Sequence, residues 1–124
     1  MATVLALVAA ALVALWGFAH AIPTSQVLAG FEPISSDNRK VMPQEWLAEA
    51  FTMWGITAIL IAVTLASGAR SDGAQWVYRT VAFLLIALAG LTALTGARTQ
   101  VIWLKVCPVL LSTSAILLIT ASLS

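Results

Sequence analysis

The chain has 124 residues and a formal net charge of +1, and 61% of its residues are hydrophobic while only 9% are charged. Soluble domains are usually about half apolar and about a quarter charged, so the composition excludes an ordinary soluble globular protein. No run of basic residues points to nucleic acid. A single cysteine, Cys107, excludes an intrachain disulfide and a multi-cysteine metal site.

Four apolar segments are each long enough to provide the roughly 20 residues that a helix needs to cross a bilayer. They cover residues 2–20, 45–67, 75–96 and 100–123. Their apolar residues run continuously instead of alternating, which favours helices over barrel strands. Residues 1–21 also resemble a signal peptide, but no Lys or Arg precedes the apolar stretch, so we expect this segment to remain as the first span.

The connections between the spans predict the topology. Residues 68–74 and 96–100 are short links, which force antiparallel neighbours. The loop over residues 22–44 is longer, and its prolines and glycine predict a series of turns more than a long helix. We therefore expect one all-α domain over residues 1–124, an up-down-up-down bundle with both termini on one side. The distribution of Lys and Arg leaves the orientation in the membrane undetermined.

Charged residues are absent from the middle of every predicted span. Ionisable side chains inside a membrane usually mark proton or ion pathways, so their absence argues against a proton-coupled transporter or pump. The hydroxyl run from Ser112 to Ser114 lies at mid-depth. We expect these side chains to bond to their own helix and to pack against a neighbouring helix.

Polar side chains collect instead at the end of the bundle that carries the first and third connections. The candidate polar site there consists of His20, Glu45, Glu49, Arg98 and Lys105. Glu45 and Glu49 are four residues apart and share a helix face, where like charges repel unless a cation intervenes. In a structural interpretation, Lys105 lies beside Glu49 and the ion pair holds two helices together. In a functional interpretation, His20 and the two carboxylates form a pocket under the loop.

Aromatic residues gather near the same end. Tryptophan belts at membrane interfaces account for most of them, but Trp46, Trp54 and Trp103 are also candidates for the wall of a pocket. One histidine with two carboxylates has the composition of a metal triad, yet no recognised ligand spacing is present. The sequence therefore predicts no metal site.

A set of short motifs extends over nearly the whole chain: His20, Asp37-Asn38-Arg39, Glu45-Trp46, Glu49, Thr95-Gly96-Ala97-Arg98 and Lys105-x-Cys107-Pro108. In layout the chain resembles small, uncharacterised four-helix bacterial membrane proteins and is similar to the DoxX-like group. The resemblance implies a four-helix bundle in the bacterial inner membrane and brings no established reaction. Proteins of the DoxX group have been linked to redox and quinone-related roles, but this chain has no redox cysteine pair.

Three classes of function remain open. The first is a non-catalytic protein, either an accessory subunit of a larger membrane complex or a binder of a small amphiphile near the polar end. The second is a membrane enzyme acting on a lipid or quinone-like substrate, with His20 or Glu49 as the acid/base group. The third is a channel or exporter formed by a homo-oligomer. We favour the first class, with the lipid bilayer as surroundings and no cofactor, although a quinone or lipid fits the second.

Overall fold

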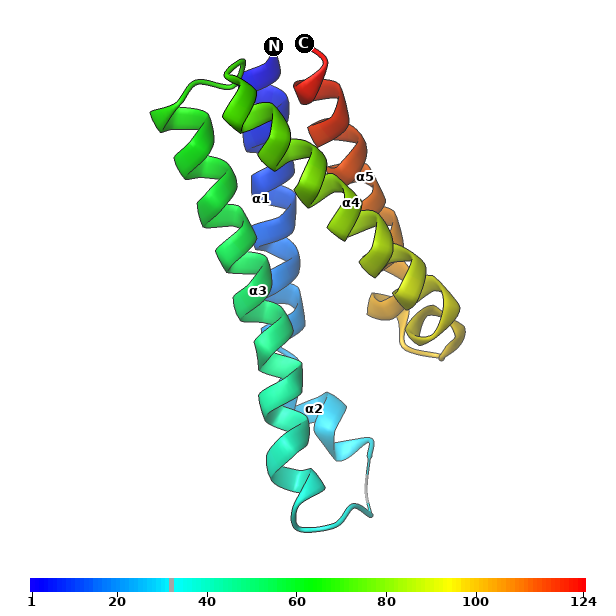
Figure 1. The fold of residues 1–124 in the computed structure, drawn as a ribbon. Coiled ribbons are helices and arrows are strands. Elements are labelled where there is room, and N and C mark those ends of the chain that lie inside the picture. Colours follow the sequence, from blue (N-terminus) through cyan, green and yellow to red (C-terminus); the bar gives the residue numbers. More distant parts are fainter. Residues whose placement is uncertain (32) are drawn as a thin grey trace.

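The computed structural model describes residues 1–31 and 33–124, and within these residues all regular structure is helical (Figure 1). Four long helices each have the length and apolar composition needed to cross a membrane. The chain is thus a small multi-pass membrane protein, and the predicted all-α bundle of four spanning helices is confirmed. The helices are α1 (Ala2–Ala21), the short α2 (Thr24–Ala29), α3 (Asn38–Ala66), α4 (Asp72–Leu94), the 3₁₀ turn η1 (Gly96–Arg98) and α5 (Ile102–Ser122).

The first connection is more helical than the sequence predicts. The expected turns over residues 22–44 contain α2, and α3 begins at Asn38 instead of residue 45. Ser35 Oγ accepts a hydrogen bond from the Asn38 backbone N–H over 3.2 Å, which satisfies one free donor at the helix start. From the sequence, Pro43 was expected to lie in a turn before the helix, but it lies inside α3 close to the beginning of this helix. Because this proline is the sixth residue of the helix and lies beyond the first turn, it removes one backbone hydrogen-bond donor there without ending the helix.

The turn between α3 and α4 shows why these two helices run antiparallel. Gly68 directly follows the helix end with φ of +79°, a left-handed conformation in which glycine ends a helix without steric cost. Ser71 then caps α4, because its Oγ accepts a hydrogen bond from the Ala74 backbone N–H over 3.2 Å. The chain reverses direction within a few residues and re-enters the bundle.

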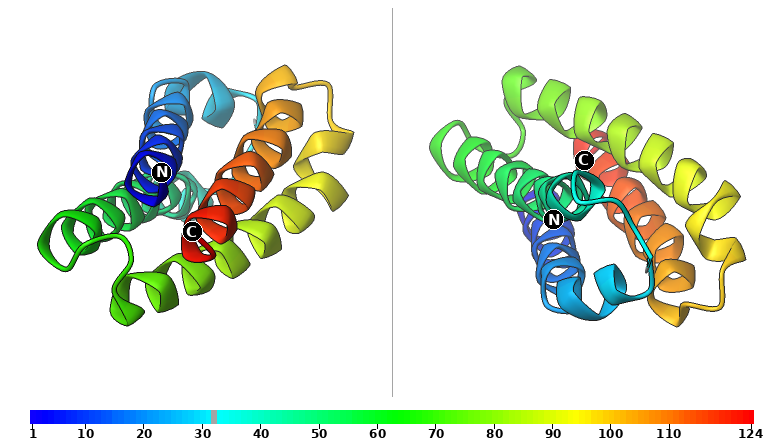
Figure 2. Two further views of the ribbon diagram at one scale, coloured as in Figure 1. Left: turned by 90° about the horizontal axis from the view of Figure 1, so that it is seen from above. Right: turned by 90° about the horizontal axis from the view of Figure 1, so that it is seen from below.

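The four long helices do not form an evenly spaced bundle. α1 packs against both α3 and α5, and α4 packs chiefly against α5. Figures 1 and 2 show α4 and α5 diverging from α1 and α3 with distance from the chain termini. We call the end with both termini and the turn over residues 67–71 the closed end. The end with α2 and η1 is the open end.

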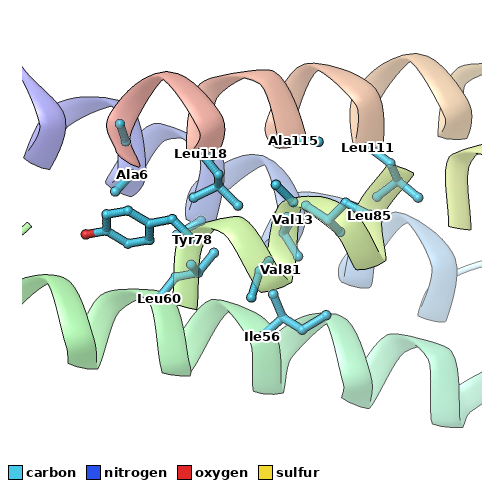
Figure 3. Close-up of a cluster of buried hydrophobic side chains, with 14 of the residues drawn as sticks. Ala6, Val13, Ile56, Leu60, Tyr78, Val81, Leu85, Leu111, Ala115 and Leu118 are labelled. Carbon is cyan, nitrogen blue, oxygen red and sulfur yellow. The ribbon is translucent and has the colours of Figure 1, made fainter. Parts of the chain in front are cut away.

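Near the closed end, small and aliphatic side chains fill the space between all four helices. Figure 3 shows Tyr78 of α4 near Leu118 of α5 and Leu60 of α3, and Leu85 farther along α4 near Leu111 of α5. Alanines dominate the matching face of α1: Ala2, Ala6, Ala9 and Ala10. The Tyr78 hydroxyl lies 2.7 Å from Thr64 Oγ1 in a buried hydrogen bond that joins α4 to α3. This interaction gives the core a polar contact whose partners are both satisfied.

Arg79 closes the same end by binding the last turn of α5. Its Nη2 donates to the Ser122 backbone carbonyl over 3.3 Å, and its Nε donates to Ser122 Oγ over 3.4 Å. The guanidinium also lies 5.7 Å from the ring centroid of Trp76. A cation at a helix C-terminus is favourable because the last carbonyls carry partial negative charge.

The hydroxyl and thiol groups of α5 contribute to packing. Thr113 and Ser114 donate to backbone carbonyls one turn earlier in their own helix, as the sequence predicts. Cys107 is buried, and its Sγ lies 3.8 Å from Thr92 Oγ1 of α4. Of these side chains, Cys107 therefore belongs to the contact between α4 and α5.

Candidate functional site

A cavity of about 460 Å³ lies at the open end, between the end of α1, α2, the start of α3 and the segment that enters α5. Its volume falls in the range of roughly 300–1,000 Å³ that is typical of small-molecule sites. The wall is mainly apolar and rich in aromatic rings. The lining residues are Trp16, Ala19, His20, Pro23, Gln26, Val27, Gly30, Phe31, Trp46, Thr99, Val101, Trp103 and Leu104.

His20 is the buried ionisable residue of this wall, with only 4% of its surface exposed. Its ring stacks on the Trp46 indole with the centroids 4.0 Å apart and the planes inclined by 16°. Trp46 Nε1 also donates to the His20 backbone carbonyl over 2.8 Å. Trp46 therefore satisfies a free carbonyl at the end of α1 and holds the imidazole in place at the same time.

Glu49, one turn after Trp46 along α3, lies next to the imidazole. Glu49 Oε2 is 3.4 Å from His20 Nε2, an ion-pair distance, but Nε2 forms no hydrogen bond within the described part of the chain. The Glu49 side chain keeps 39% exposure and does not belong to the cavity wall. The geometry thus joins two of the predicted site residues, and only His20 of the pair lines the cavity.

The other predicted polar residues do not join this pair. Glu45 is exposed and accepts a long hydrogen bond of 3.5 Å from Gln44. Lys105 and Arg98 are also exposed, and neither has a carboxylate within ion-pair distance among residues 1–31 and 33–124. The expected pairing of Lys105 with Glu49 is wrong, because Glu49 lies beside His20 of α1 while Lys105 is exposed on α5.

Two of the three tryptophans predicted to wall a pocket do so. Trp46 and Trp103 line the cavity, whereas Trp54 does not. The Trp54 indole packs beside Gly17, where the absence of a side chain leaves room for it: an added Cβ would lie 2.6 Å from Trp54 Nε1. Its ring also contacts Phe18, with centroids 4.9 Å apart. Trp54 thus packs against another face of α1, outside the wall of this cavity.

Several lining residues were not predicted from the sequence. Trp16 is 2% exposed and lies one helical turn before His20. Residues four apart share a helix face, so this spacing could have predicted that Trp16 lines the same site as His20. The residues of α2, including Val27 and those flanking it, were missed because the sequence predicted turns there. In the structure, α2 covers the cavity.

The comparisons with known proteins identify no relative of this chain. No family model matches the chain, and neither the curated proteins nor the solved structures give a significant match. The resemblance to the DoxX-like group therefore stays a prediction. Among the described residues, no group of three or more His, Cys, Asp or Glu side chains is placed to hold a metal ion. The site must accordingly be interpreted from its own geometry.

Proposed function

We propose that this membrane protein binds a small amphiphile in the cavity at its open end. The observation that carries the proposal is the combination of a mainly apolar, aromatic wall with one buried imidazole. Ligand sites commonly have this composition, in which apolar surface supplies most of the contact and a few polar groups set the orientation. A ligand with an apolar body and one polar group matches this wall.

The position of the cavity supports a ligand that comes from the bilayer. The lining residues belong to the ends of two spanning helices, to α2 and to the residues that enter α5. The open end is thus close to the depth at which a membrane meets water, as its tryptophans also indicate. An amphiphile in a bilayer orients its polar group at this same depth. The cavity therefore meets the molecule without extracting it from the membrane first.

The support for binding is stronger than the support for a reaction. His20 Nε2 and Glu49 Oε2 form a pair that could hold a proton, but the Glu49 carboxylate does not line the cavity. The imidazole is itself clamped by Trp46. We therefore assign His20 the role of orienting a bound molecule.

The experiment is native mass spectrometry of the protein extracted gently from the membrane, with two matched variants. Ala19→Leu adds bulk at a residue of the cavity wall. Ala11→Leu makes the same change on an exposed position of the same helix. We expect the wild type and Ala11→Leu to retain a small molecule, and Ala19→Leu to lose it by at least about tenfold in occupancy.

Two outcomes would contradict this proposal. An empty wild-type protein that arrives bound to other subunits would favour the accessory role. Equal retention of the molecule by both leucine variants would show that it binds elsewhere on the helices. Thermal unfolding of the three proteins in one detergent checks that Ala19→Leu keeps the fold.

A further inference from the structure

We infer that the amphiphile carries an anionic head group, which Lys105 and Arg98 bind at the margin of the cavity. This inference rests on the proposed function and specifies its ligand class as a single apolar chain with a carboxylate or phosphate head. It is carried by the position of two cations that have no carboxylate partner in the described chain.

The two cations bracket one wall of the cavity. Thr99, Val101, Trp103 and Leu104 line it, and this stretch is preceded directly by Arg98 and followed directly by Lys105. Both cationic side chains are exposed. Because both cations directly flank this stretch in the chain and have long flexible side chains, a head group at the margin of this wall lies within their reach.

Nothing in the described chain neutralises these charges. Glu49 lies beside His20 and outside the cavity wall, and Glu45 is exposed on α3 without a described cation at ion-pair distance. The described lining residues include no carboxylate. An approaching anion consequently meets two cations that have no carboxylate partner among residues 1–31 and 33–124. A cationic head group would be repelled by the same two charges, and no described acid in the wall would offset that repulsion.

The location of Lys105 adds to the argument. It lies in the first turn of α5, which has no acidic residue there and no side-chain cap. The start of a helix carries partial positive charge, so cations are unfavourable and anions favourable at this position. An ammonium next to an apolar segment is also costly unless it reaches water or an anion. A bound anionic head relieves both effects.

The volume argues for one chain with its head group. About 460 Å³ is in the lower half of the range for small-molecule sites. Apolar and aromatic residues from α1, α2 and α3 surround most of this space. A single acyl or alkyl chain fills such a space, while the second chain of a phospholipid would remain in the bilayer.

The test uses fluorescence quenching of the native tryptophans by brominated probes, with the protein in zwitterionic nanodiscs. The probes are dibrominated stearic acid, its neutral methyl ester and a matching chain with a quaternary ammonium head, at a pH at which the free acid is ionised. Trp16, Trp46 and Trp103 lie in the cavity wall. Ala19→Leu supplies the background quenching from probe that is only dissolved in the bilayer.

We expect the wild type to bind the acid about tenfold more tightly than the ester, and the ester more tightly than the ammonium probe. The double change Arg98→Gln and Lys105→Gln should lower the preference for acid over ester to about twofold or less, with the ester affinity nearly unchanged. Lys40→Gln, which removes an exposed cation of α3 outside the cavity wall, should leave the preference intact.

The outcomes separate the inference from the function on which it rests. Equal binding of the acid and the ester to the wild type would overturn the anionic head group but leave amphiphile binding in place. Quenching no greater than in Ala19→Leu would overturn the proposed function itself. The comparison of the three probes uses only the wild type and the Ala19→Leu background, so a folding defect in the double variant would not prevent a decision.

A final arm distinguishes the sources of the anion. The acid is compared with a brominated single-chain phosphate, and an unbrominated two-chain anionic phospholipid is added as a competitor. Tight binding of either single-chain anion in the presence of the phospholipid supports the inference. Loss of the preference when the phospholipid is added would overturn it, because the cations would then bind the surrounding lipid and not a ligand of the cavity.

Discussion

The closed end and the open end of the bundle differ in the size of the side chains that α1 directs at its neighbours. At the closed end these side chains are mostly alanines, and at the open end they are Trp16 and His20. Small residues let helix backbones approach closely in a membrane, whereas rings hold them apart. Helix divergence and the cavity therefore follow from the same feature, the change from small to aromatic residues along one helix.

The two ends also use different polar contacts. The closed end contains a buried hydrogen bond of 2.7 Å between Thr64 and Tyr78. At the open end, His20 and Glu49 are 3.4 Å apart without a hydrogen bond, and Glu49 is partly exposed. We expect the closed end to contribute most of the stability and the open end to be adapted to binding. Four substitutions test this difference, from the largest to the smallest expected loss in the free energy of unfolding.

Leu118→Ala should have the largest effect, a loss of about 2 kcal/mol in the free energy of unfolding. Leu118 is fully buried among α1, α4 and α5 at the closed end. The loss lies at the lower end of the usual range because unfolded helices remain in lipid, so packing contacts account for most of it. The measurement is reversible unfolding by SDS in mixed micelles. Ile116, also on α5, is 63% exposed, so Ile116→Ala should change the free energy of unfolding little. Equal losses of stability in Leu118→Ala and Ile116→Ala would contradict the assigned packing.

Gly17→Ala should destabilise the protein by about 1–2 kcal/mol. The new Cβ would lie 2.6 Å from Trp54 Nε1 and 3.2 Å from Met53 Cβ, so the rigid indole has to move. Gly55→Ala is the matched control in α3, because no atom lies within 4 Å of its added Cβ. That control should be neutral or slightly stabilising. A neutral Gly17→Ala would mean that Trp54 does not pack on α1.

Tyr78→Phe should cost about 0.6 kcal/mol, the average for side-chain hydrogen bonds between membrane helices. Thr64→Val removes the other partner, and the double variant completes a thermodynamic cycle. The two single effects should not add, because each removes the same hydrogen bond between α3 and α4. Strict additivity in the SDS titration would argue against this contact.

Glu49→Gln should have the smallest effect on stability, below about 0.5 kcal/mol, because the carboxylate is partly exposed. Binding of the brominated acid should persist, since Glu49 does not line the cavity. Glu45→Gln, on the same helix, is the control. A loss larger than that of Tyr78→Phe would instead support the interpretation of His20 and Glu49 as a structural lock between α1 and α3.

The sequence predicted most of the fold because a spanning helix is recognisable from its own residues. Continuous apolar segments identified all four spans, and the short links predicted their antiparallel order. The first connection was predicted less well. Pro43 indicated a break, yet it lies near the start of α3, and whether a proline ends a helix depends on the turns that surround it.

The candidate site was predicted in part. The loop order places His20, Trp46 and Glu49 at one end of the bundle, and the structure brings them into contact. Lys105 and Trp54 were also expected at that end, but Lys105 is exposed on α5 instead of pairing with Glu49, and the Trp54 indole packs beside Gly17. Depth in the membrane follows from the position in the chain, whereas direction depends on the rotation of each helix about its axis.

The sequence by itself therefore determined the class of protein, the number of spans, the uncharged middle and the polar end. These properties depend on the transfer of each segment from water to lipid, which is a sum over local residues. Only the tertiary structure decided that α1 lies between α3 and α5, that Glu49 pairs with His20, and that a cavity opens beside Trp46 and Trp103. Those outcomes depend on many weak contacts between helices, and the balance among them appears only when the helices are packed.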